Sequence, residues 1–545
     1  MATSLSETQA QWLPTLRVGA LLLAAGGAQA ITLAWPFAGD FQGHAQGWLQ
    51  LICLAILAWR LDRSAHKKQA FVEGWLFAWA WLLGSTWWLF ISMHRYGGLS
   101  APLAGLAVAL LAAGLALIYA AACASFHLLR AQDLGVFARA SAFAALWCLA
   151  ELTRGTLWTG FPWGAIGYAH VDSVLQHWAP WVGVYGLCAL AAFIVMWAVA
   201  RRSHTAGQRG ATAMGTLLLA AVLSYTWLTS PSRVTDSTMM SAHPLRVTLL
   251  QGNIPQDLKF GEGVGLALRY YHQALMTGDS DLTVTPETAI PLIQQQLPAH
   301  YWEQLEAHFA SGERAALMGL PLARNGDHGQ RRYSNSAIAL LPQSDVGNGV
   351  RYEYDKHHLV PFGEFVPPLF QWFVQMMNIP LNDFSSSDIN APSLHFKGER
   401  IAPNICYEDL FGEELAHRFG DAEQAPTLMV NLSNIAWFGD SVAIDQHLNI
   451  SRMRALELGR PMLRATNTGA TAIINAQGQV THRLPSAVEG ALTADVYGVH
   501  GPLTPYARWA SAWGLWPLVV WALLTLVGVM GMAYFIRHEH RPFGP

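Results

Sequence analysis

The chain has 545 residues, of which 52% are apolar and only 13% charged, and 23 are tryptophan. About a quarter of an ordinary soluble protein is charged, so this composition excludes a wholly soluble chain and indicates a membrane protein of several domains. The net charge of −3 lacks the basic excess of a nucleic-acid-binding protein. The five cysteines show no zinc-finger or redox spacing, so neither a thiolate metal site nor a disulfide framework is indicated.

Long apolar stretches predict eight membrane spans, because a helix needs about 20 apolar residues to cross a bilayer. The first stretch, with LLLAAGGAQA at 21–30, also resembles a signal peptide. Its apolar sequence continues past Ala30, however, and cleavage would not change the side on which the polar region lies. The predicted spans are 14–35, 45–61, 71–94, 101–128, 136–153, 178–200, 211–229 and 509–536.

Lys and Arg gather in alternate connections between these spans, and basic connections stay on the cytoplasmic side of a membrane. The connections after spans two, four and six and the tail after the last span are basic, whereas the connections after spans one, three and five hold one base or none. Both termini are therefore predicted to be cytoplasmic, and the polar region after span seven is predicted to lie outside. The basic residues are Arg60, Arg63, Lys67, Lys68, Arg130, Arg139, Arg201, Arg202, Arg209, Arg537 and Arg541.

The predicted domains are a membrane part over 1–230, a polar domain over 245–500, and a last span with its tail over 505–545. In the polar domain, short β-branched runs alternate with helical periodicity, which predicts an α/β sheet domain. The predicted strands are 247–250, 282–285, 316–320, 336–341, 401–406, 427–432 and 471–476, and the predicted helices are 262–276, 299–311, 409–419 and 442–459.

Three polar residues follow predicted strands: Glu287 in TVTPETAIP, Lys356 in YDKHHLVPFGEF and Cys406 in PNICYED. Functional residues of α/β sheets gather where strands end, so these three are candidates for one site. A thiol attacks a carbonyl carbon as the thiolate, which needs a base or a nearby cation, and the oxyanion that forms needs donors. Glu287 can take the proton, and Lys356 can hold the negative charge.

Two other interpretations compete with this one. Histidine is the usual partner of a catalytic cysteine, and His357, His358 and His447 lie in the same domain. Taken singly, the cysteine is also typical of a small buried residue, the glutamate of a helix cap and the lysine of a surface charge. The residue types alone leave these interpretations open.

Seven longer stretches form a specific set: QGNIPQDLKF (251–260), TPETAIP (285–291), YDKHHLVPFGEFVP (354–367), NICYEDLFG (404–412), SNIAWFGDS (433–441), RMRALELGRPMLRATNTGATAII (452–474) and TGFPWGAIGY (159–168). They resemble the nitrilase, or carbon–nitrogen hydrolase, superfamily, and most closely its membrane branch of apolipoprotein N-acyltransferases. The resemblance covers nearly the whole chain. It implies a four-layer αββα sandwich joined to a bundle of about eight transmembrane helices.

Carried over residue by residue, the resemblance implies that Cys406 is the nucleophile, Glu287 the general base and Lys356 the oxyanion donor. Glu364 matches a further acid that orients the lysine or assists proton transfer. The backbone N–H of Tyr407 would be a second oxyanion donor. Further residues of the matching stretches are Glu408 beside the nucleophile and, as substrate-binding candidates, Phe260, Trp163, Asn434 and Trp437.

Three positions depart from the family's pattern: Phe260 and Thr285 each stand where the family usually has Trp, and Ile435 stands where it has Asp. The first keeps an aromatic ring for a substrate-facing wall. The last removes an acid, which puts a catalytic role for that position in doubt but leaves the triad complete.

The implied reaction is ping-pong acyl transfer that needs no metal or cofactor. The Cys406 thiolate would attack the sn-1 ester of a phospholipid such as phosphatidylethanolamine and form a thioacyl-enzyme. The α-amine of a lipoprotein's diacylglyceryl-cysteine would then take the acyl chain as an amide. This implies a bacterial inner membrane with the catalytic domain in the periplasm, where the apolar stretches 367–379 and WFGD at 437–440 would form lids at the interface.

Two alternatives remain. A membrane-tethered amidase of the nitrilase type would use the same triad with water as the second nucleophile. A transporter or receptor would need functional polar residues within its spans, where the sequence offers Glu151, which Arg154 one helical turn later can neutralise.

Overall fold

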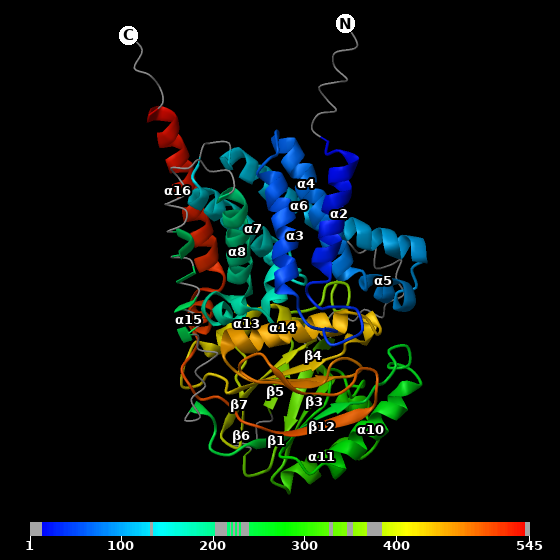
Figure 1. The fold of residues 1–545 in the computed structure, drawn as a ribbon. Helices are drawn as coiled ribbons and strands as arrows, with labels where there is room; N and C mark the ends of the chain where they lie inside the picture. The colour runs from blue at the N-terminus through cyan, green and yellow to red at the C-terminus, as the bar shows by residue number, and fades with distance from the viewer. Residues whose placement is uncertain are drawn as a thin grey trace, which may run out of the picture. The chain divides into compact units, whose positions relative to one another are not determined.

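The computed structural model describes residues 13–130, 134–201, 239–325, 331–345, 352–367 and 384–539, with short pieces between 215 and 229. The chain forms two compact units. One comprises Met1–Trp87, Pro102–Ser230 and Leu515–Pro545, and the other Trp88–Ala101 and Pro231–Gly514; Figure 1 labels their elements. Most of the predicted span 211–229 and of the predicted lid 367–379 lies outside the described residues.

The first unit is helical, and we refer to it as the membrane unit. Within the described residues, four helices are long and apolar enough to cross a membrane, or five if one bent pair counts as a single span. The predicted number of about eight is therefore not confirmed. The helices of this unit are α2 (Leu16–Ala30), α3 (Gly47–Leu61), α4 (Lys67–Thr86), α6 (Ala101–Arg130), α7 (Val136–Thr156), α8 (Ala179–Ala200) and α16 (Trp516–Glu539).

The segment predicted as the span 71–94 is bent. Helix α4 ends at Thr86, and the following turns α5 (Leu89–Ile91) and Ser92–Tyr96 run at 58° to it. Trp88 is 1% exposed, its indole N–H donates to Gln446 Oε1 at 3.1 Å, and its ring centroid lies 4.1 Å from that of Phe438. Trp88 therefore packs against Phe438 within the second unit, to which both residues belong. A hydropathy pattern does not distinguish contact with protein from contact with lipid.

In the described helices of the membrane unit two acids are buried, and both have a cationic partner. Glu151 accepts from Arg154 at 2.7 Å, as the sequence indicated. Glu73, which the sequence analysis overlooked, accepts from Arg60 at 2.7 Å. Arg154 also donates to the carbonyl oxygen of Trp163, so these charges hold helices and loops of the unit together.

The second unit, called the sheet unit below, contains two six-stranded sheets of order β12-β1-β2-β3-β4-β5 and β11-β10-β9-β8-β7-β6. In each sheet three neighbouring strands are parallel: β1, β2 and β3 in one, β7, β8 and β9 in the other. The strands are β1 (Leu245–Gln251), β2 (Leu282–Val284), β3 (Ala315–Asn325), β4 (Arg331–Leu340), β5 (Tyr352–Asp355), β6 (Leu394–Phe396), β7 (Glu399–Ile405), β8 (Leu428–Ser433), β9 (Met462–Thr466), β10 (Ala472–Ile474), β11 (Val480–Arg483) and β12 (Gly490–Val496).

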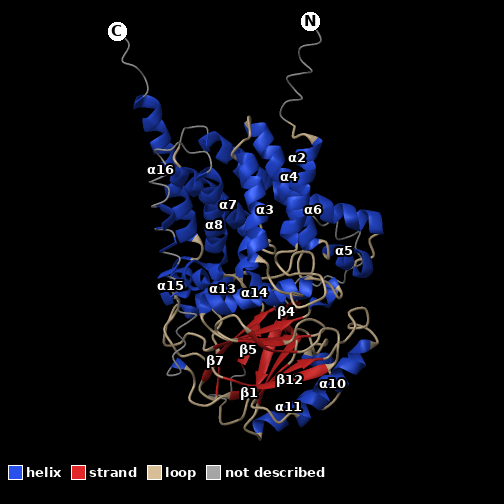
Figure 2. Ribbon diagram, viewed as in Figure 1, coloured by secondary structure: helices blue, strands red, loops and turns tan. Residues whose placement is uncertain are grey.

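The two sheets pack face to face, and helices cover their outer faces. Val247, Leu317, Ile401 and Val430 are among the fully buried residues of one core shared by both sheets. Helices α10 (Gly263–Thr277) and α11 (Tyr301–Ala310) pack on β3 and β4 through a second core. Helices α13 (Gly412–Ala416) and α14 (Ala443–Leu458) lie on the side of the other sheet, and Figure 2 shows the strands between these two helical layers. The layers of this unit are therefore helix, sheet, sheet and helix.

The predicted helix 409–419 is broken into the 3-10 turn Cys406–Leu410, α13 and a further short turn. Phe411, with ψ of 77°, leaves the helical conformation between the first two pieces. Five strands were not predicted, namely β5, β6, β9, β11 and β12. Four of these have five residues or fewer, and β12 alternates intermediate and exposed positions, so it lacks a strongly apolar face.

Candidate active site

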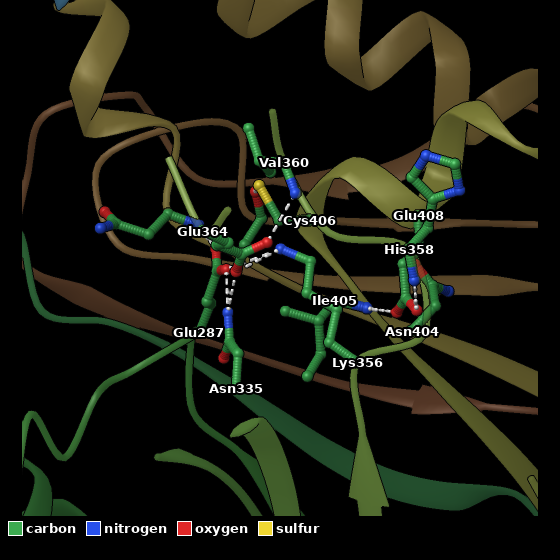
Figure 3. A network of polar contacts seen from close by, with 12 residues as sticks. Glu287, Asn335, Lys356, His358, Val360, Glu364, Asn404, Ile405, Cys406 and Glu408 are labelled. Atoms are coloured by element: carbon green, nitrogen blue, oxygen red, sulfur yellow. Dashed lines mark hydrogen bonds and ion pairs between the residues drawn. The ribbon is translucent and has the colours of Figure 1, made fainter. Parts of the chain in front are cut away.

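Lys356 lies between two carboxylates. It follows β5 and is fully buried, and its ammonium donates to Glu364 Oε1 at 2.9 Å and to Glu287 Oε1 at 3.3 Å. The amide nitrogen of Asn335, on β4, donates to the same two oxygens at 2.7 Å each. Figure 3 shows both donors aimed at the carboxylate pair. One cation and one amide thus hold together two acids that would otherwise repel each other.

Glu364 is held by its own turn. Its Oε2 accepts from the Val360 backbone N–H at 2.7 Å, and its backbone N–H donates to the Val360 carbonyl oxygen at 2.9 Å. Phe362, inside the turn, has a positive φ of 63°. Burial alone lowers the pKa of Lys356, but the charges of Glu364 and Glu287 outweigh it and raise that pKa above its ordinary value. The ammonium is therefore charged at neutral pH.

Glu287 follows β2 on a tightly anchored turn. Its Oε2 accepts from the Asn434 backbone N–H at 2.8 Å, and its own carbonyl oxygen accepts from Lys259 Nζ at 3.1 Å. Thr288, the next residue, has a φ of 50°. Strand β3 passes so close that a Cβ on Gly319 would lie 2.3 Å from a carbonyl oxygen of this turn, which only glycine avoids. The position of the Glu287 carboxylate is therefore fixed by the Asn434 backbone N–H and by the anchored turn that carries Glu287.

Cys406 follows β7 with a φ of 54°, in the sparsely populated left-handed region. Ser433, at the end of β8, directs its hydroxyl to Cys406 Sγ at 3.4 Å. The cysteine's carbonyl oxygen accepts from Asn431 Nδ2 and lies 3.3 Å from His447 Nε2. Strain of this kind persists where the surrounding structure fixes the backbone, and it concentrates at functional sites.

The thiol of Cys406 lies in surroundings that oppose its ionisation. Burial, followed by the charge of Glu287, raises its pKa to about 12, against smaller lowering contributions from Lys356, the Ser433 hydroxyl and the Asn434 backbone N–H. The resting thiol is therefore protonated at neutral pH. A nucleophilic role needs a base within the site to take this proton as the reaction proceeds.

Glu408 accepts hydrogen bonds from backbone N–H groups in two segments of the site. One of its oxygens accepts from the backbone N–H groups of His357 at 2.7 Å and His358 at 3.2 Å, and the other accepts from that of Ile405. The Tyr354 hydroxyl lies 2.8 Å from both oxygens. Burial raises the pKa of Glu408. This carboxylate therefore joins the segment that carries the lysine to the strand that carries the cysteine.

The three histidines that compete with Glu287 make other contacts. His357 Nδ1 lies 2.6 Å from a backbone carbonyl oxygen, and His358 Nδ1 lies 3.0 Å from a carboxylate of α13. His447 Nδ1 lies 3.2 Å from Arg464 Nη2, and arginine can only donate, so this nitrogen accepts and Nε2 carries the proton. Nε2–H then donates to the carbonyl oxygen of Cys406. Burial, with the charge of Arg464, lowers the pKa of His447 well below its ordinary value, so it stays neutral.

His447 is therefore expected to position the nucleophile's backbone without taking its proton. Changing His447→Leu should lower the rate of acylation of Cys406 about tenfold to a hundredfold, since small displacements of a nucleophile cost this much. His447→Gln keeps a side-chain N–H and should retain most of the rate. The measurement is the rate of thioester formation against pH, with exposed His482→Gln as control. A changed pH dependence in His447→Gln would instead identify His447 as the base.

The substrate-binding candidates differ in exposure. Phe260 is 56% exposed, and Trp437 is partly exposed, with its ring centroid 5.5 Å from that of Tyr96. Tyr407 is buried, and its ring packs edge-on against Phe411 with centroids 5.3 Å apart. Phe260 and Trp437 therefore offer apolar surface to a ligand, whereas the Tyr407 ring is part of the packing.

Asn434 and Trp163, the other two substrate-binding candidates, make contacts within the protein. Asn434 Nδ2 donates to Gln256 Oε1 at 2.8 Å, and its Oδ1 accepts from Asn467 at 3.2 Å, so the side chain ties the loop after β1 to the loop after β8. Trp163 belongs to the membrane unit, where it is 3% exposed and its carbonyl oxygen accepts from Arg154.

Two of the three residues that depart from the family's pattern have structural roles. Thr285 is fully buried, and its hydroxyl oxygen accepts from the Gly319 backbone N–H at 3.1 Å, which helps to hold β3 against the Glu287 turn. Ile435 is 2% exposed and packs against Gly469, where a Cβ would lie 2.6 Å from its side chain. An apolar residue fits this position.

Three residues of the site were missed by the sequence analysis: Asn335, Lys259 and Ser433. Asn335 stands one residue before the strand predicted at 336–341, and Ser433 one residue after that predicted at 427–432. Lys259 lies in the quoted stretch QGNIPQDLKF, is 3% exposed, and has its pKa lowered to about 8 by burial. Their position as polar residues at the ends of predicted strands was the signal that could have identified Asn335 and Ser433.

Among the described residues, no group of three or more His, Cys, Asp or Glu is arranged to hold a metal ion.

Comparisons with known proteins identify the family of the chain. A family model described as the apolipoprotein N-acyltransferase N-terminal domain matches residues 27–197, and one described as carbon–nitrogen hydrolase matches residues 246–498. An apolipoprotein N-acyltransferase of Verminephrobacter eiseniae is 51% identical over 516 residues, which cover 90% of this chain and 92% of that protein. One of Ralstonia nicotianae is 45% identical over 471 residues, which cover 85% and 86%.

Among solved structures, a carbon–nitrogen hydrolase from Helicobacter pylori matches with a TM-score of 0.33 and 16% identity, covering 47% of this chain and 89% of its own. The two full-length relatives and the two family models together span both units of the chain. The chain belongs to the apolipoprotein N-acyltransferase family.

Proposed function

We propose that this protein transfers an acyl chain from the sn-1 position of a phospholipid to the α-amino group of a lipoprotein's N-terminal diacylglyceryl-cysteine. The observation that carries this proposal is the buried Glu287–Lys356 pair in the same site as the Cys406 thiol, in a chain with full-length relatives named apolipoprotein N-acyltransferase. Cys406 is the proposed nucleophile, Glu287 the base and Lys356 the oxyanion donor.

In the first half-reaction, Glu287 takes the thiol proton while Cys406 Sγ attacks the ester carbonyl carbon. Negative charge develops on the carbonyl oxygen, where the Lys356 ammonium and the Tyr407 backbone N–H stabilise it. The carbon–oxygen bond of the ester breaks, and the departing alkoxide receives the proton from Glu287. The products are a lysophospholipid and a thioester on Cys406.

In the second half-reaction, the neutral α-amine of the lipoprotein attacks the thioester carbon. Glu287 accepts a proton from the attacking nitrogen, and the carbon–sulfur bond breaks with its electron pair on Sγ. The proton then passes to the thiolate, which restores the resting enzyme. The product is an amide, and the donors that stabilised the first oxyanion also stabilise the second.

The pKa of Cys406 fits this order of events. A thiol whose pKa is raised to about 12 by burial holds its proton at rest, so it is protected from solvent oxidants that react with thiolates. Deprotonation by Glu287 accompanies the attack of the sulfur on the ester. Lys356, kept charged by Glu364 and Glu287, is the proposed partner of the new negative charge.

One experiment tests this function against the amidase alternative. Purified enzyme is incubated with phosphatidylethanolamine labelled in its sn-1 chain and with a diacylglyceryl lipopeptide. The proposal expects label in an amide on the lipopeptide and a stoichiometric lysophospholipid. Labelled free fatty acid without lipopeptide acylation would support hydrolysis by water and contradict the proposal.

For the membrane unit, we propose eight spans in a bacterial inner membrane, with both termini cytoplasmic and the sheet unit in the periplasm. Helices α2 and α3 have 15 residues each, and the apolar sequence predicted as spans extends beyond α2 at both ends. The alternation of basic connections supports the orientation. Fluorescent-protein fusions at the C-terminus should be fluorescent and alkaline phosphatase fusions there inactive; an active phosphatase at the C-terminus would contradict this topology.

A further inference from the structure

Strand β8 presents two side chains to Cys406 from one face. β8 runs parallel to β7 with Leu432 in register with Ile405, and alternate residues of a strand point to the same side. Asn431 and Ser433 therefore share a face, and both are fully buried. Asn431 reaches the carbonyl oxygen of Cys406, and Ser433, two residues on, reaches the sulfur.

The position of Ser433 is fixed by its backbone. Its carbonyl oxygen accepts from the Asn467 backbone N–H at 3.1 Å, and it pairs in register with Thr466 of β9. Among the contacts of the described residues, the one polar partner of its hydroxyl is Cys406 Sγ, at 3.4 Å. A serine hydroxyl always has a proton to donate, whereas a thiolate can only accept.

We propose that Ser433 is a further catalytic residue, which donates a hydrogen bond to the sulfur of Cys406 whenever that sulfur carries negative charge. This occurs twice in the reaction. When Glu287 takes the thiol proton, the hydroxyl stabilises the thiolate that attacks the ester. When the amine displaces the thioester, the carbon–sulfur bond breaks with its electrons on sulfur, and the same hydroxyl stabilises the leaving thiolate.

This inference rests on the proposed function for its two half-reactions, but the contact can be tested without any acyl substrate. Both positive and negative groups surround the sulfur of Cys406. The neutral Ser433 hydroxyl can therefore stabilise the thiolate without placing another cation in the buried site. Burial and the charge of Glu287 raise the thiol's pKa, and the hydrogen bond from Ser433 lowers it. The titratable and charged groups that face the thiol are Glu287, Lys356, Lys259, His447 and Arg464.

The test is the rate at which iodoacetamide alkylates Cys406 in the full-length, detergent-purified protein, followed by peptide mass spectrometry. Ser433→Ala should be alkylated about three- to tenfold more slowly at neutral pH. Loss of a hydrogen bond to a charged group costs about one pH unit of thiol ionisation, and the greater nucleophilicity of the more basic thiolate offsets part of this loss. The rate should also reach its half-maximum at a higher pH.

Two variants separate the hydroxyl from packing. Ser433→Thr keeps the hydroxyl in a strand, which favours β-branched residues, and should restore the wild-type rate. Ser280→Ala removes the hydroxyl of another buried serine of the same unit, which bonds at Leu282 and Thr283, and should not change the rate. Thermal melting checks that all variants are folded.

Equal alkylation rates for wild type and Ser433→Ala would overturn the proposal, and so would a Ser433→Thr variant as slow as Ser433→Ala. These outcomes are independent of the proposed function, because no acyl donor is present. If wild-type enzyme failed to acylate the lipopeptide while Ser433→Ala still slowed alkylation, the acyl-transfer function would be wrong and the contact between Ser433 and the thiol would stand.

Discussion

Cys406→Ala is expected to abolish acyl transfer while the protein remains folded. Without the sulfur no thioester can form, and no other cysteine lies in the catalytic domain over 245–500. Alanine fits the same space, and the backbone there is held by Asn431 and His447 through the carbonyl oxygen, which the substitution leaves in place. Cys406→Ser should retain little or no activity, because a serine hydroxyl is a much weaker nucleophile than a thiolate.

The measurement is intact mass spectrometry after incubation with phospholipid alone. Wild-type enzyme should gain the mass of one acyl chain, hydroxylamine should remove it, and Cys406→Ala should show no gain. Cys53→Ala, a buried cysteine of the membrane unit, is the matched control and should behave as wild type. If purified Cys406→Ala enzyme still N-acylated a diacylglyceryl lipopeptide, the covalent mechanism would be wrong.

Residues at the ends of strands were the predictable part of the site. Glu287 and Cys406 follow β2 and β7, which belong to the parallel parts of the two sheets, where alternation with helices is visible in the sequence, and Lys356 follows β5. Chain order and strand ends were enough to group these three. The other contacts depend on how the two sheets face each other. Nothing in the sequence aims Asn335 at two carboxylates or directs His447 to the carbonyl oxygen of Cys406.

The membrane unit was harder to predict for a different reason. Hydropathy measures whether a residue avoids water, but it does not say whether lipid or protein covers the residue. Trp88 and Ile91 are apolar and extend the pattern of α4, yet Trp88 packs on Phe438 and Ile91 lies next to Gly439 in the sheet unit. The predicted span 71–94 therefore joined a helix of one unit to a segment of the other.

Lys356→Met is expected to remove most of the acyl-transfer activity and also to destabilise the protein. Loss of one oxyanion donor costs about a hundredfold to a thousandfold in kcat. Methionine keeps the length of the side chain, but it leaves the carboxylates of Glu287 and Glu364 joined only by Asn335. Removing one partner of a buried ion pair costs about 3–5 kcal/mol, so the melting temperature at neutral pH should fall by several degrees.

The pH dependence of this loss identifies its cause. In wild type, the pKa of Lys356 is raised above its ordinary value, so its stabilising contribution is complete at neutral pH and is lost only as the pH rises through the raised pKa. In Lys356→Met the two acids repel each other unless one takes up a proton, so the destabilisation should shrink as the pH is lowered.

Lys397→Met is the matched control, because Lys397 forms a partly exposed ion pair with Asp281. Exposed pairs contribute about 0–1 kcal/mol, so this variant should melt within a degree or two of wild type and retain full activity. Thermal melting and the lipopeptide assay, run side by side over pH, give both readouts. If Lys356→Met melted like Lys397→Met at every pH, the carboxylate pair would not depend on the lysine. The oxyanion role would then rest on the kinetic loss alone, and a Lys356→Met enzyme with wild-type kcat would exclude that role as well.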